Sequence, residues 1–408
     1  MSAPASRPRD DERRLWGFAL LLATLTTIGP FAVDTYLPSF PAIGQSLGAS
    51  AFEVQQTLSV YLACFSVTML VHGTLADRYG RRPVIVAGLA VFAVASVACA
   101  LAQSIGALIA ARGLQGLSAG AGMVVARAIV RDRFPGPEAQ RLMARMTMIF
   151  GIAPAVAPVL GGWLHHWFGW RSVFVFLAAL AVVLLAATLR FLPETLAHER
   201  RQPINPRYVL RTASAMLAHR QFMLLSGAVA FEFAGLWLYI AAAPAFLMDH
   251  LGLDERQFGW LFVTMVVGMI IGSYVSSRAR TPVAMRRAVT AGYAVQAFAA
   301  AVNVAYCAAF EPRLPWAIAP IFLYCVGMYL AKPTLLIAIL DLFPDNRGMA
   351  SSVQAFLQTL AGSLVAGFVA PALAVSPLAL ALGMALALGA GLLCWAAYLG
   401  ELRAAPAR

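Results

Sequence analysis

The chain has few charged side chains. Of its 408 residues, 12% are Asp, Glu, Lys or Arg, about half of the roughly 25% that is usual in a soluble globular protein. Hydrophobic residues make up 61%, and the mean hydropathy is +0.77. Too few charges are present to cover a water-exposed surface, so the sequence excludes a water-soluble fold and predicts an outer surface that faces lipid.

Other chemical groups are scarce as well. The five cysteines lie inside apolar stretches, which favours small buried hydrophobic residues over a disulfide framework or a zinc site. The single lysine, Lys332, precedes Pro333, and no phosphate-binding G-x-x-x-x-G-K-[ST] loop occurs, so ATP-driven transport within this chain has no support. His165 and His166 lack a third metal ligand. With no Ser/His/Asp pattern either, we expect no enzyme activity, no metal and no cofactor.

Long apolar runs dominate what is present. Each is long enough for the ~20 residues with which a helix crosses the membrane, and none shows the ten-residue alternation of a membrane barrel. We therefore predict an all-α integral membrane protein. The expected spans are near 15–38, 54–73, 84–103, 107–127, 143–164, 172–192, 222–247, 258–276, 287–309, 315–340, 349–372 and 377–399.

Arginine marks one side of the predicted membrane. With these spans, 25 of the 29 Arg residues fall on the side of both termini, Arg171, Arg256 and Arg313 fall on the other, and Arg112 lies within a span. Cytoplasmic loops are enriched in Lys and Arg, so both termini are predicted to be cytoplasmic. The net charge of +12 therefore reflects topology rather than nucleic-acid binding. The first run is too long for a signal peptide, so we expect it to stay as helix 1.

The chain also repeats itself. Asp132-Arg-Phe-Pro135 after the fourth span recurs as Asp341-Leu-Phe-Pro344 after the tenth, as expected for a transporter built from duplicated halves. The predicted domains are an N-terminal six-helix bundle at 1–192, a cytoplasmic linker at 193–220 and a C-terminal six-helix bundle at 221–408.

The loop after the second span carries the most specific motif. Residues 73–83 read GTLADRYGRRP, in which Gly73 and Gly80 allow close packing and a tight turn. This segment resembles the signature of the major facilitator superfamily between helices 2 and 3. The resemblance implies two pseudo-symmetric bundles and a latch between them on the cytoplasmic side, with Asp77 and Arg81 in that role. A loop that only sets topology is the alternative.

Two charged residues lie inside the first half. Arg112 begins RGLQG, which resembles the R-x-x-Q-G motif of this superfamily, and Asp34 begins DTYLP, which resembles the D-x-x-x-P element of drug:proton antiporters. Both lie at similar depth, Asp34 near the outer end of helix 1, so they could pair or share a proton-dependent network. A structural ion pair without a transport role is the alternative.

The fifth span reads GIAPAVAPVLGG over residues 151–162. It resembles the Gly- and Pro-rich motif of antiporters, with Pro154, Pro158, Gly161 and Gly162, although Ala157 stands where a Gly is usual. A plain bent packing helix is the alternative. Together with the Asp34 element, the pattern looks closest to the bicyclomycin and chloramphenicol resistance (Bcr/CflA) branch of drug:proton antiporters.

The second half contributes two ionisable residues within spans. Such residues are functional hypotheses by default, so Glu232 is a second candidate proton carrier beside Asp34. Lys332 could neutralise Glu232 or reach toward the cytoplasmic interface. Aromatic rings suit an apolar or cationic ligand. The substrate cavity is predicted to include Tyr36, Tyr61, Trp237, Tyr239 and Lys332.

These features predict a monomeric secondary transporter of the bacterial inner membrane. We expect proton-driven export of drug-like amphipathic molecules by alternating access, with protons and lipid as its other partners and no nucleic acid. A proton-coupled uptake symporter or a metabolite exporter of the same fold is the alternative. The substrate, the proton stoichiometry and the choice between Asp34 and Glu232 stay open at this point.

Overall fold

The computed structural model describes residues 8–134, 136–201, 206–279 and 281–404, and they are almost entirely helical. Twelve helical spans in these ranges are long and apolar enough to cross a membrane, which confirms the predicted number. Their main helices are α1 (Pro8–Asp34), α3 (Ala51–Tyr79), α4 (Arg81–Leu101), α5 (Ile105–Arg133), α6 (Gly136–Phe168), α7 (Arg171–Phe191), α9 (Arg220–Ala241), α10 (Gly259–Ser276), α11 (Pro282–Ala309), α12 (Ala319–Asp341), α13 (Arg347–Leu364) and α15 (Pro377–Ala404).

Shorter helical segments fill the connections. They are η1 (Leu37–Ser39), α2 (Phe40–Leu47), η2 (His198–Arg200), α8 (Pro206–Ala218), η3 (Ala245–His250), η4 (Glu255–Phe258), η5 (Pro344–Asn346), η6 (Val365–Val369) and α14 (Ala370–Leu373). Two of them, η3 and η6, are π-helical. Such turns are rare and often occur at functional sites.

The first span is longer than predicted. It runs from Gly17 to Leu47, because α1 ends at Asp34 and the chain continues through η1 and α2. The expected end near Pro38 is wrong, because Pro38 and Pro41 occupy the first turns of η1 and α2, where a missing backbone N–H costs nothing. Asp34 therefore lies near the middle of the span, at a bend, and not near its outer end.

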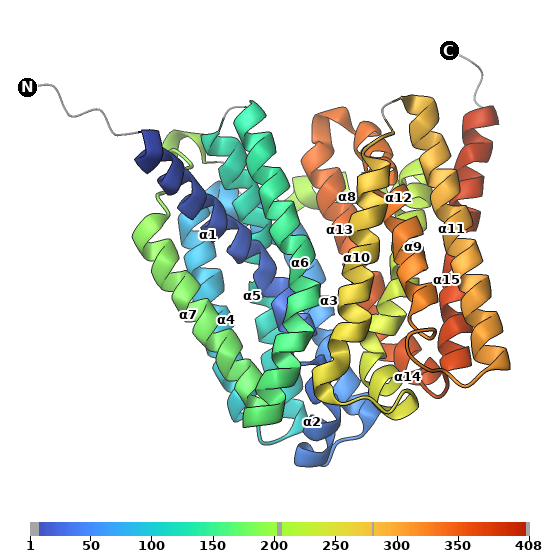
Figure 1. Ribbon diagram of the computed structural model, residues 1–408. Coiled ribbons are helices and arrows are strands. Elements are labelled where there is room, and N and C mark those ends of the chain that lie inside the picture. Colours follow the sequence, from blue (N-terminus) through green and yellow to red (C-terminus); the bar gives the residue numbers. More distant parts are fainter. Residues whose placement is uncertain (1–7, 135, 202–205, 280, 405–408) are drawn as a thin grey trace, which may run out of the picture.

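The helices form two groups, which we call the N-terminal half (α1–α7) and the C-terminal half (α9–α15). Figure 1 shows them side by side, blue to green and yellow to red, with the first and last helices beginning and ending at the same end of the molecule. We call this the terminal end. The far end carries α2, η4 and α14. The helix α8, inside the expected linker, packs on α9 and α13; residues 202–205 of that linker lie outside the described part.

The halves are joined at the far end. Three side chains in the first nine residues of α3 bond to the C-terminal half: Gln55 to the carbonyl oxygen of Ala241, Gln56 to that of Gly367, and Ser59 to that of Ser363. The other end of α3 carries Asp77, roughly 27 Å further along at 1.5 Å per residue, and its side chain is 46% exposed.

Candidate functional site

Arg112 is a fully buried cation at the centre of the N-terminal half. Its Nη1 donates to the carbonyl oxygen of Ala32 at 3.0 Å and to the side chain of Gln115. The guanidinium carbon lies 4.2 Å from the ring centroids of both Tyr36 and Tyr61, so two aromatic faces enclose the charge. Tyr36 and Tyr61 are themselves fully buried, so neither lines a cavity in this conformation, and their predicted role in substrate binding stays a prediction.

Asp34 lies close to this cluster without pairing with it. It is the last residue of α1, its exposure is 5%, and it makes no hydrogen bond or ion pair with any described residue. The expected direct pair with Arg112 is not formed: Nη1 of Arg112 bonds to Ala32 and Gln115, and its Nε and Nη2 have no partner among the described residues. A buried carboxyl group without a partner is costly when ionised, and this marks Asp34 as a group whose charge matters to the structure.

The glycine pair that ends the helix 5 motif lies where three segments meet. A β-carbon at Gly161 would collide with the backbone carbonyl of Thr35, the residue after Asp34. A β-carbon at Gly162 would collide with the carbonyl of Glu255 in the C-terminal half. These adjacent glycines therefore let α6 lie against the bend of the first span and against η4 at once. The α-helix continues through Pro154 and Pro158, each of which removes one backbone hydrogen bond.

Polar groups reinforce this contact at the far end. Nδ1 of His166 lies 2.8 Å from Oε1 of Glu255, which links α6 to η4, and the guanidinium of Arg256 lies 5.6 Å from the Trp163 ring centroid. Asp254 bonds to Arg256 at 2.7 Å. Partial burial opposes ionisation of Asp254, but the hydrogen bonds and charge of Arg256 outweigh it, so the pKa of Asp254 lies below its usual range.

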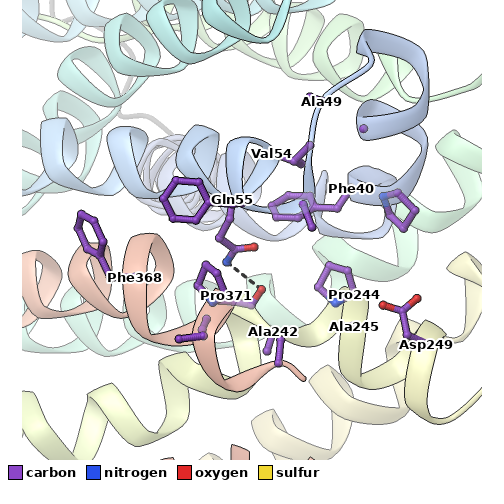
Figure 2. A pocket seen from close by; sticks show the side chains of 18 of the residues that line it. Phe40, Ala49, Val54, Gln55, Ala242, Pro244, Ala245, Asp249, Phe368 and Pro371 are labelled. Carbon is purple, nitrogen blue, oxygen red and sulfur yellow. Dashed lines mark hydrogen bonds between the residues drawn. The ribbon is translucent and has the colours of Figure 1, made fainter. Parts of the chain in front are cut away.

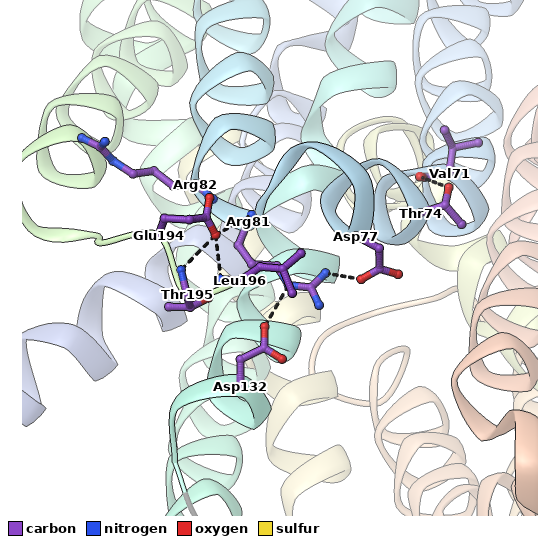
Figure 3. Close-up of polar contacts among 9 residues, drawn as sticks. All are labelled: Val71, Thr74, Asp77, Arg81, Arg82, Asp132, Glu194, Thr195 and Leu196. Carbon is purple, nitrogen blue, oxygen red and sulfur yellow. Dashed lines mark hydrogen bonds and ion pairs between the residues drawn. The ribbon is translucent and has the colours of Figure 1, made fainter. Parts of the chain in front are cut away.

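The loop motif at the terminal end bonds within the N-terminal half (Figure 3). Arg81 pairs with Asp77 at 2.6 Å and with Asp132 at 2.9 Å, so one guanidinium ties α3, α4 and the end of α5 together. The exposed Asp77 side chain leaves the predicted latch role untested. A β-carbon at Gly73 would make only ordinary contact with Val124, so the expected close packing at Gly73 is wrong.

Gly80 and Glu194 determine how α4 begins at the terminal end. The sequence did not predict the role of Glu194. Gly80 has a φ of 102° and provides no capping side chain for α4. Glu194 supplies that cap from the segment after α7: its carboxylate accepts from the backbone N–H of Arg81 at 3.0 Å and of Arg82 at 3.3 Å (Figure 3). The available signal was an acidic residue directly after the sixth span, in an otherwise Arg-rich segment.

The C-terminal half buries its own carboxyl group. Glu232, in the middle of α9, is 1% exposed, and its Oε1 accepts a hydrogen bond from Gln296 at 3.3 Å. Its Oε2 has no hydrogen-bond partner in the described part of the chain. The ammonium of Lys332 lies 4.6 Å from the ring centroid of Phe233 and 5.1 Å from that of Tyr329, so it packs over aromatic faces. It makes no direct ion pair with Glu232, although the two charges interact at longer range.

Two predicted cavity aromatics of α9 are placed differently. Tyr239 is fully buried, and its hydroxyl accepts a hydrogen bond from Asn303 of α11 at 2.7 Å. In this conformation it therefore packs in the core, and its predicted place in the substrate cavity stays a prediction. Trp237 is half-buried, with its ring 3.4 Å from the position of a β-carbon at Gly362 in α13. Its indole N–H is buried and finds no acceptor among the described residues.

Comparison with known proteins identifies the family of this chain. The family model of the Major Facilitator Superfamily matches residues 20–366. The chain is 31% identical over 353 residues to the uncharacterised MFS-type transporter YdgK of Bacillus subtilis, covering 86% of this chain and 88% of the relative. It is 30% identical over 279 residues to the bicyclomycin resistance protein homolog of Haemophilus influenzae, covering 68% and 70%. It is 29% identical over 351 residues to the multidrug resistance protein MdtL of Escherichia coli O45:K1, covering 85% and 86%.

A solved structure gives the same fold. The human organic anion transporter MFSD10 (TETRAN) superposes with a TM-score of 0.68 at 20% sequence identity, covering 96% of this chain and 100% of that chain. Twelve helical spans in the described ranges, the resistance-protein relatives and the family match over most of the sequence agree with one another. The chain is a multi-pass membrane transporter, not an enzyme, and it belongs to the major facilitator superfamily.

Proposed function

We propose that this transporter exports drug-like amphipathic molecules in exchange for protons, with Asp34 as the proton carrier. Relatives named for bicyclomycin and multidrug resistance support a drug-like cargo. The antiporter motif at Pro154, Pro158, Gly161 and Gly162 supports export over uptake. The transporter would work as a monomer, without a cofactor, on the energy of the proton gradient.

The placement of Asp34 carries this proposal. Its buried carboxyl group has no partner among the described residues, and the next residue, Thr35, contacts Gly161 of α6. The neighbouring Gly162 contacts Glu255 across the joint between the halves. Two contacts, Thr35 with Gly161 and Gly162 with Glu255, therefore link Asp34 to the surface along which the halves must separate. The neutral group suits the joined arrangement, whereas the ionised group favours water and separation of the far end.

The different preferences of neutral and ionised Asp34 give a transport cycle. We assign the terminal end to the cytoplasm of a bacterial inner membrane, because its loops carry most of the arginine. When the far end is open, drug leaves and Asp34 takes an external proton; the neutral group then permits the far end to close. When the terminal end is open, drug binding favours release of that proton inward. A drug that binds the deprotonated form more tightly makes the exchange obligatory by linkage.

The moving units of this cycle would be the two bundles, 1–192 and 221–408. The segment 193–220 would tether them, since its helix α8 bonds to the C-terminal half through Tyr208 and Asn346 at 3.0 Å, while Glu194 caps α4 in the N-terminal half. Alternating access by rocking of two repeats is the usual mechanism for such architectures.

Proton flux in inverted membrane vesicles tests the proposal. Vesicles energised by respiration would receive chloramphenicol, bicyclomycin or a lipophilic cation in turn, with wild type, Asp34→Asn and Asp34→Glu. We expect drug-triggered proton release from wild type, partial release with Asp34→Glu and none with Asp34→Asn. Full active export by Asp34→Asn would remove Asp34 as the carrier. No response to any compound would withdraw the drug assignment and favour a nutrient or metabolite carrier.

The same experiment separates Asp34 from Glu232. The Glu232 carboxyl group accepts a hydrogen bond from Gln296, and both it and the Trp237 indole N–H are buried in this conformation. We assign them a place in drug recognition, together with the cation of Lys332, in a conformation that exposes them. Glu232→Gln is expected to change which drugs trigger proton release while leaving release itself intact. Loss of release with every drug would instead make Glu232 part of the proton path.

A further inference from the structure

A cavity of about 670 Å³ lies between the halves at the far end. One wall comes from α2 and the start of α3, with Phe40 and Phe52; the other comes from residues 241–249 and 368–374, with Phe368 and Asp249 (Figure 2). A volume of this size suits a drug-sized molecule, since ligand pockets of ~300–1,000 Å³ are typical. The two π-helical segments η3 and η6 both contribute lining residues.

The cavity is separate from the interior of the transporter. Gln55 lines it and at the same time donates to the carbonyl oxygen of Ala241 at 3.0 Å (Figure 2). Gln56 and Ser59, which follow along α3, bond to Gly367 at 2.8 Å and to Ser363 at 2.9 Å. These contacts across the joint close the cavity floor. A molecule in the cavity is therefore reached from the far end and not through the centre.

The lining chemistry selects one class of ligand. Most lining residues are Ala, Pro and Phe, and Asp249 is the one ionisable side chain among those that line the cavity in the described chain. The Asp249 side chain is exposed and makes no hydrogen bond or ion pair with a described residue. Three aromatic rings and one free carboxylate complement an amphipathic molecule with a single positive charge.

We propose that this cavity is a second binding site for amphipathic monovalent cations, and that its occupancy holds the far end closed. Because its walls come from both halves, it exists in this form only while the far end is joined, and a ligand that binds only one state stabilises that state. The inference rests on the proposed function in one respect, the cytoplasmic location of the terminal end. With that orientation the cavity faces the outside of the cell. Exported cations that accumulate outside would then bind in the cavity and slow further turnover.

Cysteine protection tests binding without transport. In a cysteine-free version of the full chain, purified in lipid nanodiscs, Ala372→Cys on the cavity wall would react with a maleimide in the presence of methyltriphenylphosphonium or of the neutral triphenylphosphine oxide. We expect the cation to protect Ala372→Cys at concentrations about tenfold lower than the neutral compound. Val375→Cys, 74% exposed and outside the lining, serves as the control and should stay unprotected. Ala49→Cys on the opposite wall replaces Ala372→Cys if that variant does not fold.

Three further arms decide the outcome. Asp249→Asn should abolish the preference for the cation. Asp34→Asn, whose neutral side chain favours the joined arrangement, should keep that preference and protect at least as well as the protein with Asp34 intact. The cation should also speed disulfide formation between Ser59→Cys and Ser363→Cys, whose hydroxyl oxygens lie 3.4 Å apart in the joined arrangement. Equal protection by both compounds, an unchanged preference in Asp249→Asn, loss of protection in Asp34→Asn, or no protection at all would overturn the proposal. None of these readouts depends on proton exchange, so a failure of the proposed function would appear separately.

Discussion

Ser59 of α3 and Ser363 of α13 bond to each other in both directions across the two halves. The Ser59 hydroxyl donates to the carbonyl oxygen of Ser363 at 2.9 Å, and the Ser363 hydroxyl donates to the carbonyl oxygen of Ser59 at 2.8 Å. Both side chains are buried. This reciprocal pair requires the two backbones to approach closely, so it can form only when the far end is joined.

A cysteine pair at these positions should therefore report the joined arrangement. The hydroxyl oxygens lie 3.4 Å apart, and small side-chain rotations would bring two sulfur atoms to the ~2.05 Å of a disulfide. We expect Ser59→Cys/Ser363→Cys to cross-link on mild oxidation, to lose export when oxidised and to regain it on reduction. Each single variant is the control. Export that continues in the fully cross-linked protein would show that this joint does not open during transport.

The helix 5 glycines give the sharpest packing prediction. Gly161→Ala and Gly162→Ala each place a methyl group against a backbone carbonyl, an overpacking that typically costs about 1–3 kcal/mol. We expect export to fall at least fivefold and cross-linking of the Ser59/Ser363 pair to slow. Gly151→Ala, in the same helix but facing open space, should behave like wild type. Equal effects at positions 151 and 162 would mean that general helix properties, not the close approach, explain the loss.

His166 and Glu255 should modulate the joint more weakly. Their side-chain contact is partly exposed, and such exposed polar pairs contribute about 0–1 kcal/mol. His166→Ala or Glu255→Gln is therefore expected to slow cross-linking of the Ser59/Ser363 pair by up to about fivefold, and the double variant should add little to either single change. Glu311→Gln, which breaks an exposed ion pair with Arg313 within the C-terminal half, is the matched control. Strict additivity of the two single variants would contradict a direct pair.

Glu194 should stabilise the terminal end. Its carboxylate caps α4, and loss of such a cap typically costs about 0.5–2 kcal/mol. We expect Glu194→Ala to lower the thermal midpoint of the purified protein, while Glu199→Ala, an exposed acid in the same segment, does not. Gly80→Ala should lower the midpoint as well, because a non-glycine residue at a φ of 102° costs about 1–3 kcal/mol. Unchanged thermal midpoints for Glu194→Ala and Gly80→Ala would show that Glu194 does not stabilise the start of α4.

Hydropathy and the arginine distribution were sufficient to predict twelve spans, because membrane insertion is governed by local composition. Contacts were harder to predict. Asp34 and Arg112 lie in one region, yet similar depth does not specify which groups pair, and only Nη1 of Arg112 is bonded, to Ala32 and Gln115. Tyr239 looked like a cavity residue, but aromatic character alone does not tell which helix face points inward. Glu194 was missed because its partners at the start of α4 are more than a hundred residues away in sequence.

The coupling of Asp34 to the far-end joint is tested most directly by the pH dependence of cross-linking. The rate for Ser59→Cys/Ser363→Cys would be measured across pH in purified protein, once with Asp34 intact and once with Asp34→Asn added. The first rate would be divided by the second, so that thiol ionisation cancels. Protonation removes the charge that opposes joining, so this ratio should approach one at low pH and fall as pH rises. A ratio that stays constant across pH would contradict a role for the Asp34 proton in closing the far end.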